Sequence, residues 1–111
     1  MDRSLWQDHN TYLTHLTELL TSRRTPLIIA GDFNQRLPRK NQPINSHQLL
    51  VTALQHLTVH TKDTTDPALI DHIATTNDFE MQTSHVIHRQ CDGNTLSDHD
   101  GVTVTLTWTV G

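Results

Sequence analysis

Hydrophobic residues recur at three- and four-residue steps near the start of the chain, a spacing that places side chains on one face of a helix. This pattern runs over residues 5–20. We expect the helix to begin after a capping side chain, Asp2 or Ser4, and to end near Ser22–Arg24, where cations suit the negative end of its dipole.

A second amphipathic segment follows residues 35–45, a polar stretch whose prolines and charges are typical of a loop. Asn45 or Ser46 can cap this helix, because both side chains accept hydrogen bonds from free backbone N–H groups. The apolar side of the helix is expected to carry Leu49, Leu50, Ala53, Leu54 and Leu57.

Strands are predicted between and after the two helices. The continuous apolar run 27–30 is typical of a strand buried on both faces of a sheet. Residues 102–110 alternate apolar residues with threonine, which predicts a strand with one apolar and one hydroxyl face. Further strands are expected at 57–61, 69–74 and 81–88, separated by loops at 62–67, 76–78 and 90–100. This order predicts one α/β domain over residues 1–111.

Composition narrows the class of protein. The chain has 111 residues and a net charge of −4, which argues against nucleic-acid binding by bulk positive charge alone. An enzyme that neutralises phosphate with a bound metal remains open. The single cysteine, Cys91, excludes an internal disulfide and favours a reducing compartment. Because the start lacks the build of a signal peptide and no apolar run is long enough to span a bilayer, we expect a cytoplasmic protein without a membrane partner.

Three short segments place Asp, Asn or His where a predicted strand meets a loop: residues 31–34, 70–73 and 97–99. In α/β sheets, ligands bind in the crevice outside the strand ends. The side chains of Asp32, Asn34 and Asp98 offer oxygen ligands, which suit Mg²⁺ or Mn²⁺ better than a soft metal. These segments are therefore the candidate metal site.

His99 is the candidate acid–base group of this site. It follows Asp98 directly, so the two side chains diverge, and one can face a metal while the other faces the substrate. A histidine can donate a proton to phosphate or accept one from water. Asp71 can hold the imidazole ring in one orientation and tautomer.

Each segment alone also has a purely structural explanation. Residues 32–34 and 98–101 are both typical of turns, since Asp and Asn bond easily to nearby backbone. His72, beside Asp71, is expected to have a structural role. The cations after the first turn, Arg36, Arg39 and Lys40, can contact a phosphate backbone or lie in a solvated loop.

A zinc site is a further alternative, because His85 and His88 lie close together in the sequence. No Cys or His partners with zinc-finger spacing accompany them, which argues against this hypothesis.

Taken together, three segments resemble motifs of the endonuclease/exonuclease/phosphatase superfamily, which has the DNase I-like fold. Residues 26–34 resemble its strand and turn ending in Gly-Asp-Phe-Asn. Residues 69–73 resemble its Ile-Asp-His-Ile segment, and residues 96–99 its closing Ser-Asp-His motif. The motifs occur in the family's order, and the resemblance extends over essentially the whole chain.

The resemblance implies metal-assisted hydrolysis of a phosphodiester or phosphomonoester, with a nucleic acid among the candidate substrates. Asp32 would orient and activate the attacking water, and Asn34 would bind phosphate or metal beside it. Asp98 would ligate Mg²⁺ or Mn²⁺. His99 would contact the scissile phosphate, with Asp71 buttressing the ring.

The resemblance covers only the C-terminal half of the family's four-layer α/β sandwich. It implies one mixed β-sheet with helices on one face and a second face that needs a partner. The N-terminal half normally supplies a metal-binding Glu, and neither Glu18 nor Glu80 lies in a matching motif. Gly101 departs from the Pro that is common there.

We therefore expect a homodimer, or pairing with a chain that supplies the N-terminal half. The alternative functions are a catalytically silent binding or assembly module and a truncated fragment that retains the fold motifs.

Overall fold

The structure, a computed structural model, describes residues 3–21, 26–37, 39, 42–62 and 69–109. It is a mixed α/β structure with two helices and small antiparallel sheets in these residues. The elements are α1 (Arg3–Thr21), β1 (Ile28–Asp32), α2 (Ile44–Ala53), β2 (Thr58–Val59), β3 (Asp71–Thr75), β4 (Phe79–Ile87), β5 (Gln90–Cys91), β6 (Asn94–Thr95) and β7 (Gly101–Trp108).

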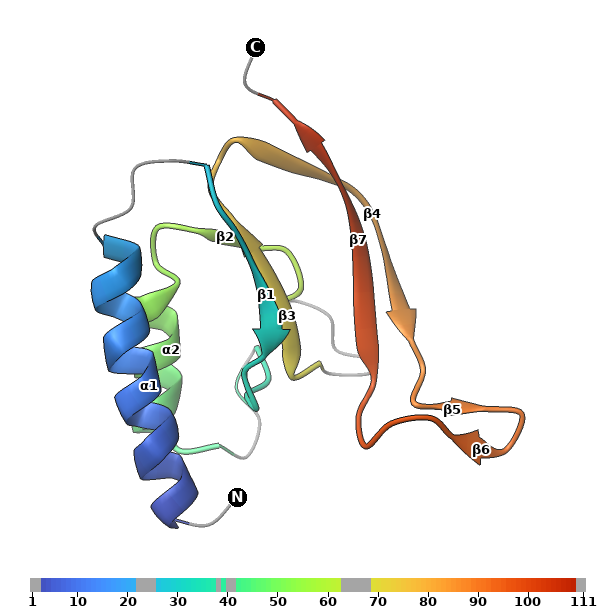
Figure 1. Ribbon diagram of the computed structural model, residues 1–111, viewed down its shortest axis with the longest axis horizontal. Coiled ribbons are helices and arrows are strands. Elements are labelled where there is room, and N and C mark those ends of the chain that lie inside the picture. Colours follow the sequence, from blue (N-terminus) through green and yellow to red (C-terminus); the bar gives the residue numbers. More distant parts are fainter. Residues whose placement is uncertain (1–2, 22–25, 38, 40–41, 63–68, 110–111) are drawn as a thin grey trace.

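The strands pair in three separate groups rather than in the one mixed sheet that we expected. The first group has the order β1-β3-β2, the second pairs β4 with β7, and the third pairs β5 with β6. Every one of these pairings in the described residues is antiparallel. Figure 1 shows α1 and α2 side by side on one face of the β1-β3-β2 sheet, with the β4–β7 ribbon on its other side.

The core lies between the two helices and the β1-β3-β2 sheet. Its buried members come from both helices, from β3 and from the segment after β1: Leu13, Phe33, Leu37, Leu50, Leu54 and Ala74. The apolar periodicity that predicted the helices therefore marks their buried faces. Removing these side chains from water is the main stabilising contribution to this half of the molecule.

The ends of α1 differ in part from the prediction. Ser4 lies inside the helix, so it is not the cap. Asp2 and Ser22–Arg24 lie outside the described residues.

Helix α2 begins at Ile44, before both predicted caps. Pro43 occupies the capping position, and no side chain of the described residues caps the helix. Ser46 instead lies in the first turn, where its hydroxyl donates a hydrogen bond to Asn10 Oδ1 at 2.6 Å. A tertiary contact with α1 thus uses the polar group that the sequence suggested for local capping.

Strand β1 is an edge strand and is not buried on both faces as predicted. Among the described strands it pairs with β3 alone, and Ile28 is 49% exposed. Ile29 faces the core, while the alternate positions face away from the helices. A short apolar run does not distinguish a doubly covered strand from an edge strand, since cover depends on distant segments.

The segment 90–100, predicted as a loop, contains the short β5–β6 hairpin. Its turn residues, Asp92 and Gly93, have φ angles of 53° and 81°. Positive φ at both central positions is the signature of the tight turn that Asp-Gly favours. The Asp-Gly pair was the sequence signal for this hairpin.

The β4–β7 ribbon follows the predicted alternation. The apolar residues Val102, Val104 and Leu106 are half-buried, and the threonines between them are exposed. Val110 lies outside the described residues. A two-stranded ribbon is only marginally stable by itself, so its apolar side needs further cover.

Candidate functional site

Asp32 and Asp71 lie directly opposite each other at one end of the β1–β3 pair. Further along β3, His72 and Ala74 are buried, and Ala74 belongs to the core beneath the helices. Side chains alternate between the two faces of a strand, so Asp71 points to the face away from the helices. Asp32 shares that face, because directly opposed residues of an antiparallel pair lie on the same side.

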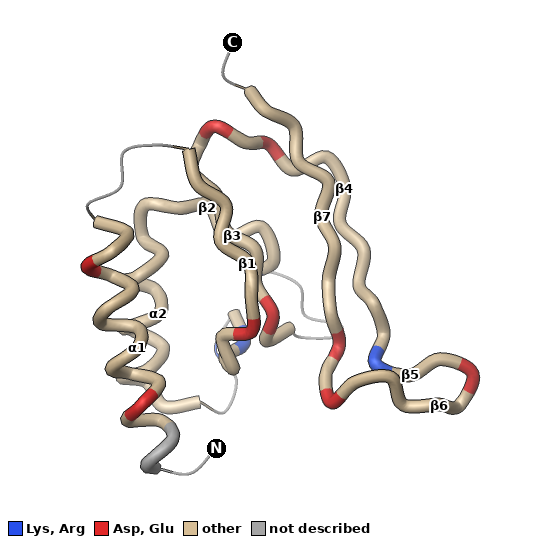
Figure 2. Tube along the Cα trace, in the orientation of Figure 1, with Lys and Arg blue, Asp and Glu red and all other residues tan. Residues whose placement is uncertain are grey.

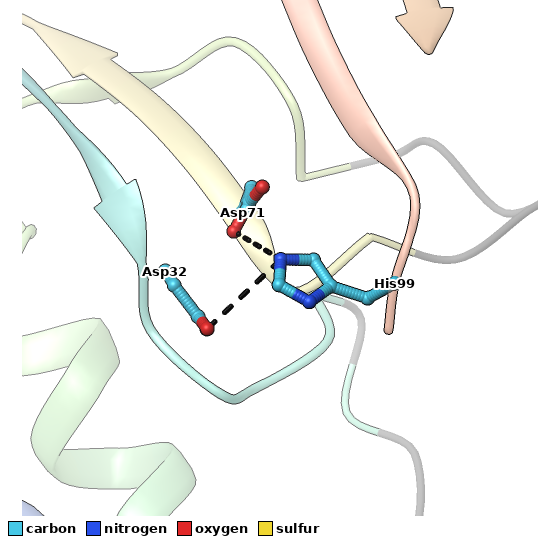
Figure 3. A group of neighbouring side chains, drawn as sticks. All are labelled: Asp32, Asp71 and His99. Atoms are coloured by element: carbon cyan, nitrogen blue, oxygen red, sulfur yellow. Dashed lines mark hydrogen bonds and ion pairs between the residues drawn. The ribbon is translucent and has the colours of Figure 1, made fainter. Parts of the chain in front are cut away.

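His99, from the segment before β7, lies over this pair of carboxylates. Its Nε2 atom is 3.0 Å from Asp71 Oδ1 and 4.0 Å from Asp32 Oδ2. Figure 3 shows both carboxylates directed at the same edge of the imidazole ring. The contact between Asp71 and His99 that we expected from the sequence is therefore present.

The opposite nitrogen of the ring faces Asp98. Its Nδ1 atom lies 2.6 Å from Asp98 Oδ1, and the side chain of Asp98 is 90% exposed. Asp98 thus lies across the imidazole ring from Asp32 and Asp71. The structure does not place it in one group with Asp32, the arrangement implied by a metal set of Asp32, Asn34 and Asp98.

Two carboxylate neighbours favour the charged form of His99. A carboxylate oxygen only accepts hydrogen bonds, so both ring nitrogens donate when His99 is an imidazolium. Burial alone would lower the pKa of His99, but the hydrogen bonds to Asp98 and Asp71 and the charges of Asp71 and Asp32 together raise it. The hydrogen bond from His99 and its charge also lower the pKa of Asp98.

Asp32, Asp71 and His99 are the group of described side chains that could hold a metal ion, with ligand atoms all within 4.8 Å of one another. If His99 Nε2 binds a cation, Asp98 becomes the carboxylate that orients the ring from behind. The geometry then places Asp71 on the metal side and Asp98 on the orienting side, whereas the resemblance implied the reverse.

Asn34 belongs to the turn that follows β1. Its backbone N–H donates to Asp32 Oδ1 at 2.8 Å, and its φ angle is 54°. The local turn considered as an alternative is therefore present. The turn also orients the side chain of Asp32, because the hydrogen bond holds Oδ1 while Oδ2 is directed toward His99.

A buried hydrogen-bond network holds this turn from below. His72 Nε2 lies 2.7 Å from the carbonyl oxygen of Gln35, which can only accept, so this nitrogen carries the proton. His72 Nδ1 then accepts from the hydroxyl of Thr61 at 2.8 Å. Burial lowers the pKa of His72 and outweighs the nearby carboxylates, which favours this neutral form. The expected structural role of His72 is confirmed.

Sequence reasoning did not single out Gln35 or Thr61. Both are buried, with exposed fractions of 0% and 1%, and Gln35 Nε2 also contacts His9 Nε2 at 2.9 Å. An isolated Gln or Thr in a polar stretch carries no local signal of burial, so only the tertiary structure identifies them.

A small cavity of about 150 Å³ adjoins the site. It is lined by Arg36, Ile70, Arg89, Asp98, His99 and Asp100. Figure 2 shows acidic positions at the ends of β1 and β3 and before β7, and basic positions after β1 and before β5. A larger cavity of about 480 Å³ lies beside α2 and contains no predicted site residue.

The remaining candidates lie elsewhere. His85 and His88 are exposed and belong to no metal-ligating group in the part of the chain that the structure describes. Arg39 is exposed and donates to the carbonyl of Gln42, while Lys40 lies outside the described residues. Neither helix is long and apolar enough, within the described ranges, to cross a membrane.

Comparisons of the chain with models of protein families, with curated proteins and with solved structures found no match. The functional conclusion therefore depends on the geometry of Asp32, Asp71 and His99 and on the cavity beside them.

The buried network predicts a specific cost for Thr61→Val. This substitution removes the donor to His72 and the acceptor of the Ile73 N–H, which bonds to Thr61 Oγ1 at 3.3 Å. We expect a loss of about 1–3 kcal/mol in the free energy of unfolding, measured by urea denaturation. Thr58→Val, at an exposed position of β2, is the control and should change stability by no more than about 0.5 kcal/mol. Equal losses in the two variants would contradict the network.

The ion pairs of His99 predict its titration. In the metal-free protein, NMR should give His99 a pKa above the ordinary value of about 6.5, and Asp71→Asn should lower that pKa. Asp8→Asn, an exposed position on α1, should leave it unchanged. Because the pKa is raised on folding, the stability that His99 contributes is complete below the unfolded pKa and is lost as pH rises through the folded pKa. A His99 pKa that Asp71→Asn does not lower would contradict the ion pair.

Proposed function

We propose that this chain supplies metal- and phosphate-binding residues of a divalent-metal-dependent phosphoester hydrolase, of nuclease or phosphatase type, in the endonuclease/exonuclease/phosphatase superfamily. One observation supports this most directly. Asp32, Asp71 and His99 come from three separate segments, and their ligand atoms nevertheless lie within 4.8 Å of one another. The three segments are those that carry the resemblance.

The donor set fits a divalent cation. Two carboxylates are the usual protein share of a Mg²⁺ site, whose other positions are filled by water and substrate phosphate. The imidazole of His99 favours a softer ion, so we expect Mn²⁺ to bind at least as well as Mg²⁺. When bound, such an ion supplies Lewis-acid stabilisation of charge on the phosphoryl oxygens.

The chain's own residues have three tasks in this proposal. Asp32 orients the attacking water through the oxygen that its turn leaves free. His99 would bind the same cation through Nε2 when its ring is uncharged. Asp98, whose Oδ1 lies 2.6 Å from Nδ1, would accept the remaining N–H of the ring and so direct Nε2 at the cation.

A catalytically silent assembly module is the second candidate, and the same geometry contains an observation in its favour. A charged His99 already compensates Asp71 through a contact of 3.0 Å, so the carboxylates can be stable without a metal ion. Metal binding is therefore the property that separates the two functions.

Metal titration tests this directly. We expect Mn²⁺ at about 100 times its dissociation constant to stabilise the wild-type fold by about 2.7 kcal/mol, measured as a rise in the thermal midpoint. Asp32→Asn and Asp71→Asn should each abolish that rise, although Asp71→Asn relieves repulsion in the metal-free protein. Paramagnetic broadening of the His99 resonances by Mn²⁺ gives a second measurement.

The matched control for this titration is Asp8→Asn, which removes an exposed carboxylate on α1. It should respond to Mn²⁺ as the wild type does. A wild-type protein without any Mn²⁺ response would favour the silent module, and equal responses in all variants would place the ion elsewhere.

Pairing with a second chain is part of the proposal. Large apolar side chains are exposed on β1 and on both strands of the ribbon: Ile28 (49%), Met81 (36%), Ile87 (51%) and Trp108 (53%). The helices cover one face of the β1-β3-β2 sheet and the two-stranded β4–β7 ribbon lies on its other side (Figure 1), so these apolar side chains of β1 and the ribbon remain without cover in the described residues. A second copy, or a chain that supplies the N-terminal half, would provide this cover.

Light scattering after size-exclusion chromatography tests the pairing. At tens of micromolar we expect a mass above that of the 12.6 kDa monomer, or a shift to a larger complex when the complementary half is added. Met81→Ser should weaken the association, whereas Val51→Ser, at a more exposed apolar position on α2 (49%), should not. A monomer under both conditions would contradict the pairing.

A further inference from the structure

We propose that Arg36 and Arg89 form a phosphate subsite beside His99, so that this chain recognises its substrate through a phosphoryl group rather than through a base, sugar or lipid. This inference rests on the proposed function and assigns its substrate contact.

The size of the cavity supports a phosphate-sized occupant. Its volume is about 150 Å³, and a water molecule takes about 30 Å³ in the liquid. Drug-sized ligands occupy pockets of about 300–1,000 Å³. A tetrahedral phosphate group with a few waters therefore fits, while the rest of a larger substrate would remain outside.

The two arginines reach the cavity from different segments. Arg36 follows β1, and Arg89 lies between β4 and β5. Within the described residues, neither guanidinium group forms a hydrogen bond or an ion pair. One guanidinium group can donate two parallel hydrogen bonds to phosphate oxygens. Two arginines on one small cavity, neither with another partner for its guanidinium group in the described residues, are therefore well suited to bind a phosphate.

The backbone of each arginine is nevertheless fixed. Gln42, which is 5% exposed, donates from Nε2 to the carbonyl of Arg36 at 2.8 Å. The backbone N–H of Arg89 donates to Asp100 Oδ1 at 2.7 Å. Because the backbone is already fixed, the entropic cost of binding is confined to ordering the two arginine side chains.

The charges around the cavity predict that phosphate binding depends on the metal. Asp98 and Asp100 line the cavity with the two arginines and His99, and Asp71 and Asp32 face Nε2 of the same imidazole ring, so carboxylates are in excess. This excess opposes an anion until a divalent cation offsets it. Phosphate and metal should therefore strengthen each other's binding by the same factor.

Titration with inorganic phosphate in saturating Mg²⁺, at constant ionic strength, tests the subsite. We expect Arg36→Gln and Arg89→Gln each to weaken phosphate binding by about tenfold or more, because each removes hydrogen bonds to a charged group. Lys62→Gln removes one exposed positive charge at the larger cavity and should change the affinity by less than about twofold.

Arg89→Lys is the control for a general effect of the substitution on the structure. It keeps the charge and loses the paired donors, so its phosphate affinity should lie between those of the wild type and Arg89→Gln. Backbone amide spectra of each variant should match the wild type away from the cavity.

The outcomes separate the subsite from the proposed function. Phosphate affinity unchanged in both glutamine variants, or reduced equally by Lys62→Gln, would overturn the subsite even if the metal binds at Asp32 and Asp71. If Mg²⁺ and Mn²⁺ fail to bind while phosphate affinity still depends on both arginines, the subsite stands and the metal-dependent function fails.

Discussion

Two carboxylates directly opposite each other in an antiparallel strand pair repel, and this constraint governs the arrangement of the site. Asp32 and Asp71 occupy such a position at the end of β1 and β3. His99, 3.0 Å from Asp71, supplies a positive charge that offsets this repulsion when its ring is protonated. Because His99 comes from the segment before β7, this interaction also joins the ribbon to the helix-covered sheet. A cation in place of the proton on His99 would offset the same repulsion between the two carboxylates.

The pleat of β3 points Asp71 and His72 to opposite faces of the strand, so His99, which contacts Asp71, and His72 have different surroundings. Asp71 faces the ion pair, and His72, the next residue, faces the interior. Burial lowers the pKa of His72, which bonds as the neutral ring to Gln35 and Thr61, whereas carboxylates raise the pKa of His99. His72 supports the turn that positions Asp32, and His99 contacts the carboxylate of Asp71 itself. One face of β3 thus carries the histidine that supports the turn, and the other face carries the carboxylate that contacts His99.

Much of this molecule could be predicted from local patterns. The apolar periodicity predicted both helices, because a helix buries one face regardless of its partner. The alternation from Val102 to Leu106 predicted the half-buried face of β7. The contact between Asp71 and His99 was predicted from the motifs. The caps at Ser4, Asn45 and Ser46 were wrong, since Ser46 bonds to Asn10 across the helix pair.

By itself the sequence predicted both helices, the longer strands in their order and the candidate side chains of the site. Only the tertiary structure decided that β1 is an exposed edge strand, that Asp98 lies across the imidazole from Asp71, and that Arg89 lines the same cavity as Arg36. The reason is the range of the interactions involved. Periodicity and turn chemistry act over a few residues, whereas cover of a strand, the side of a ring and the lining of a cavity depend on segments far apart in the chain.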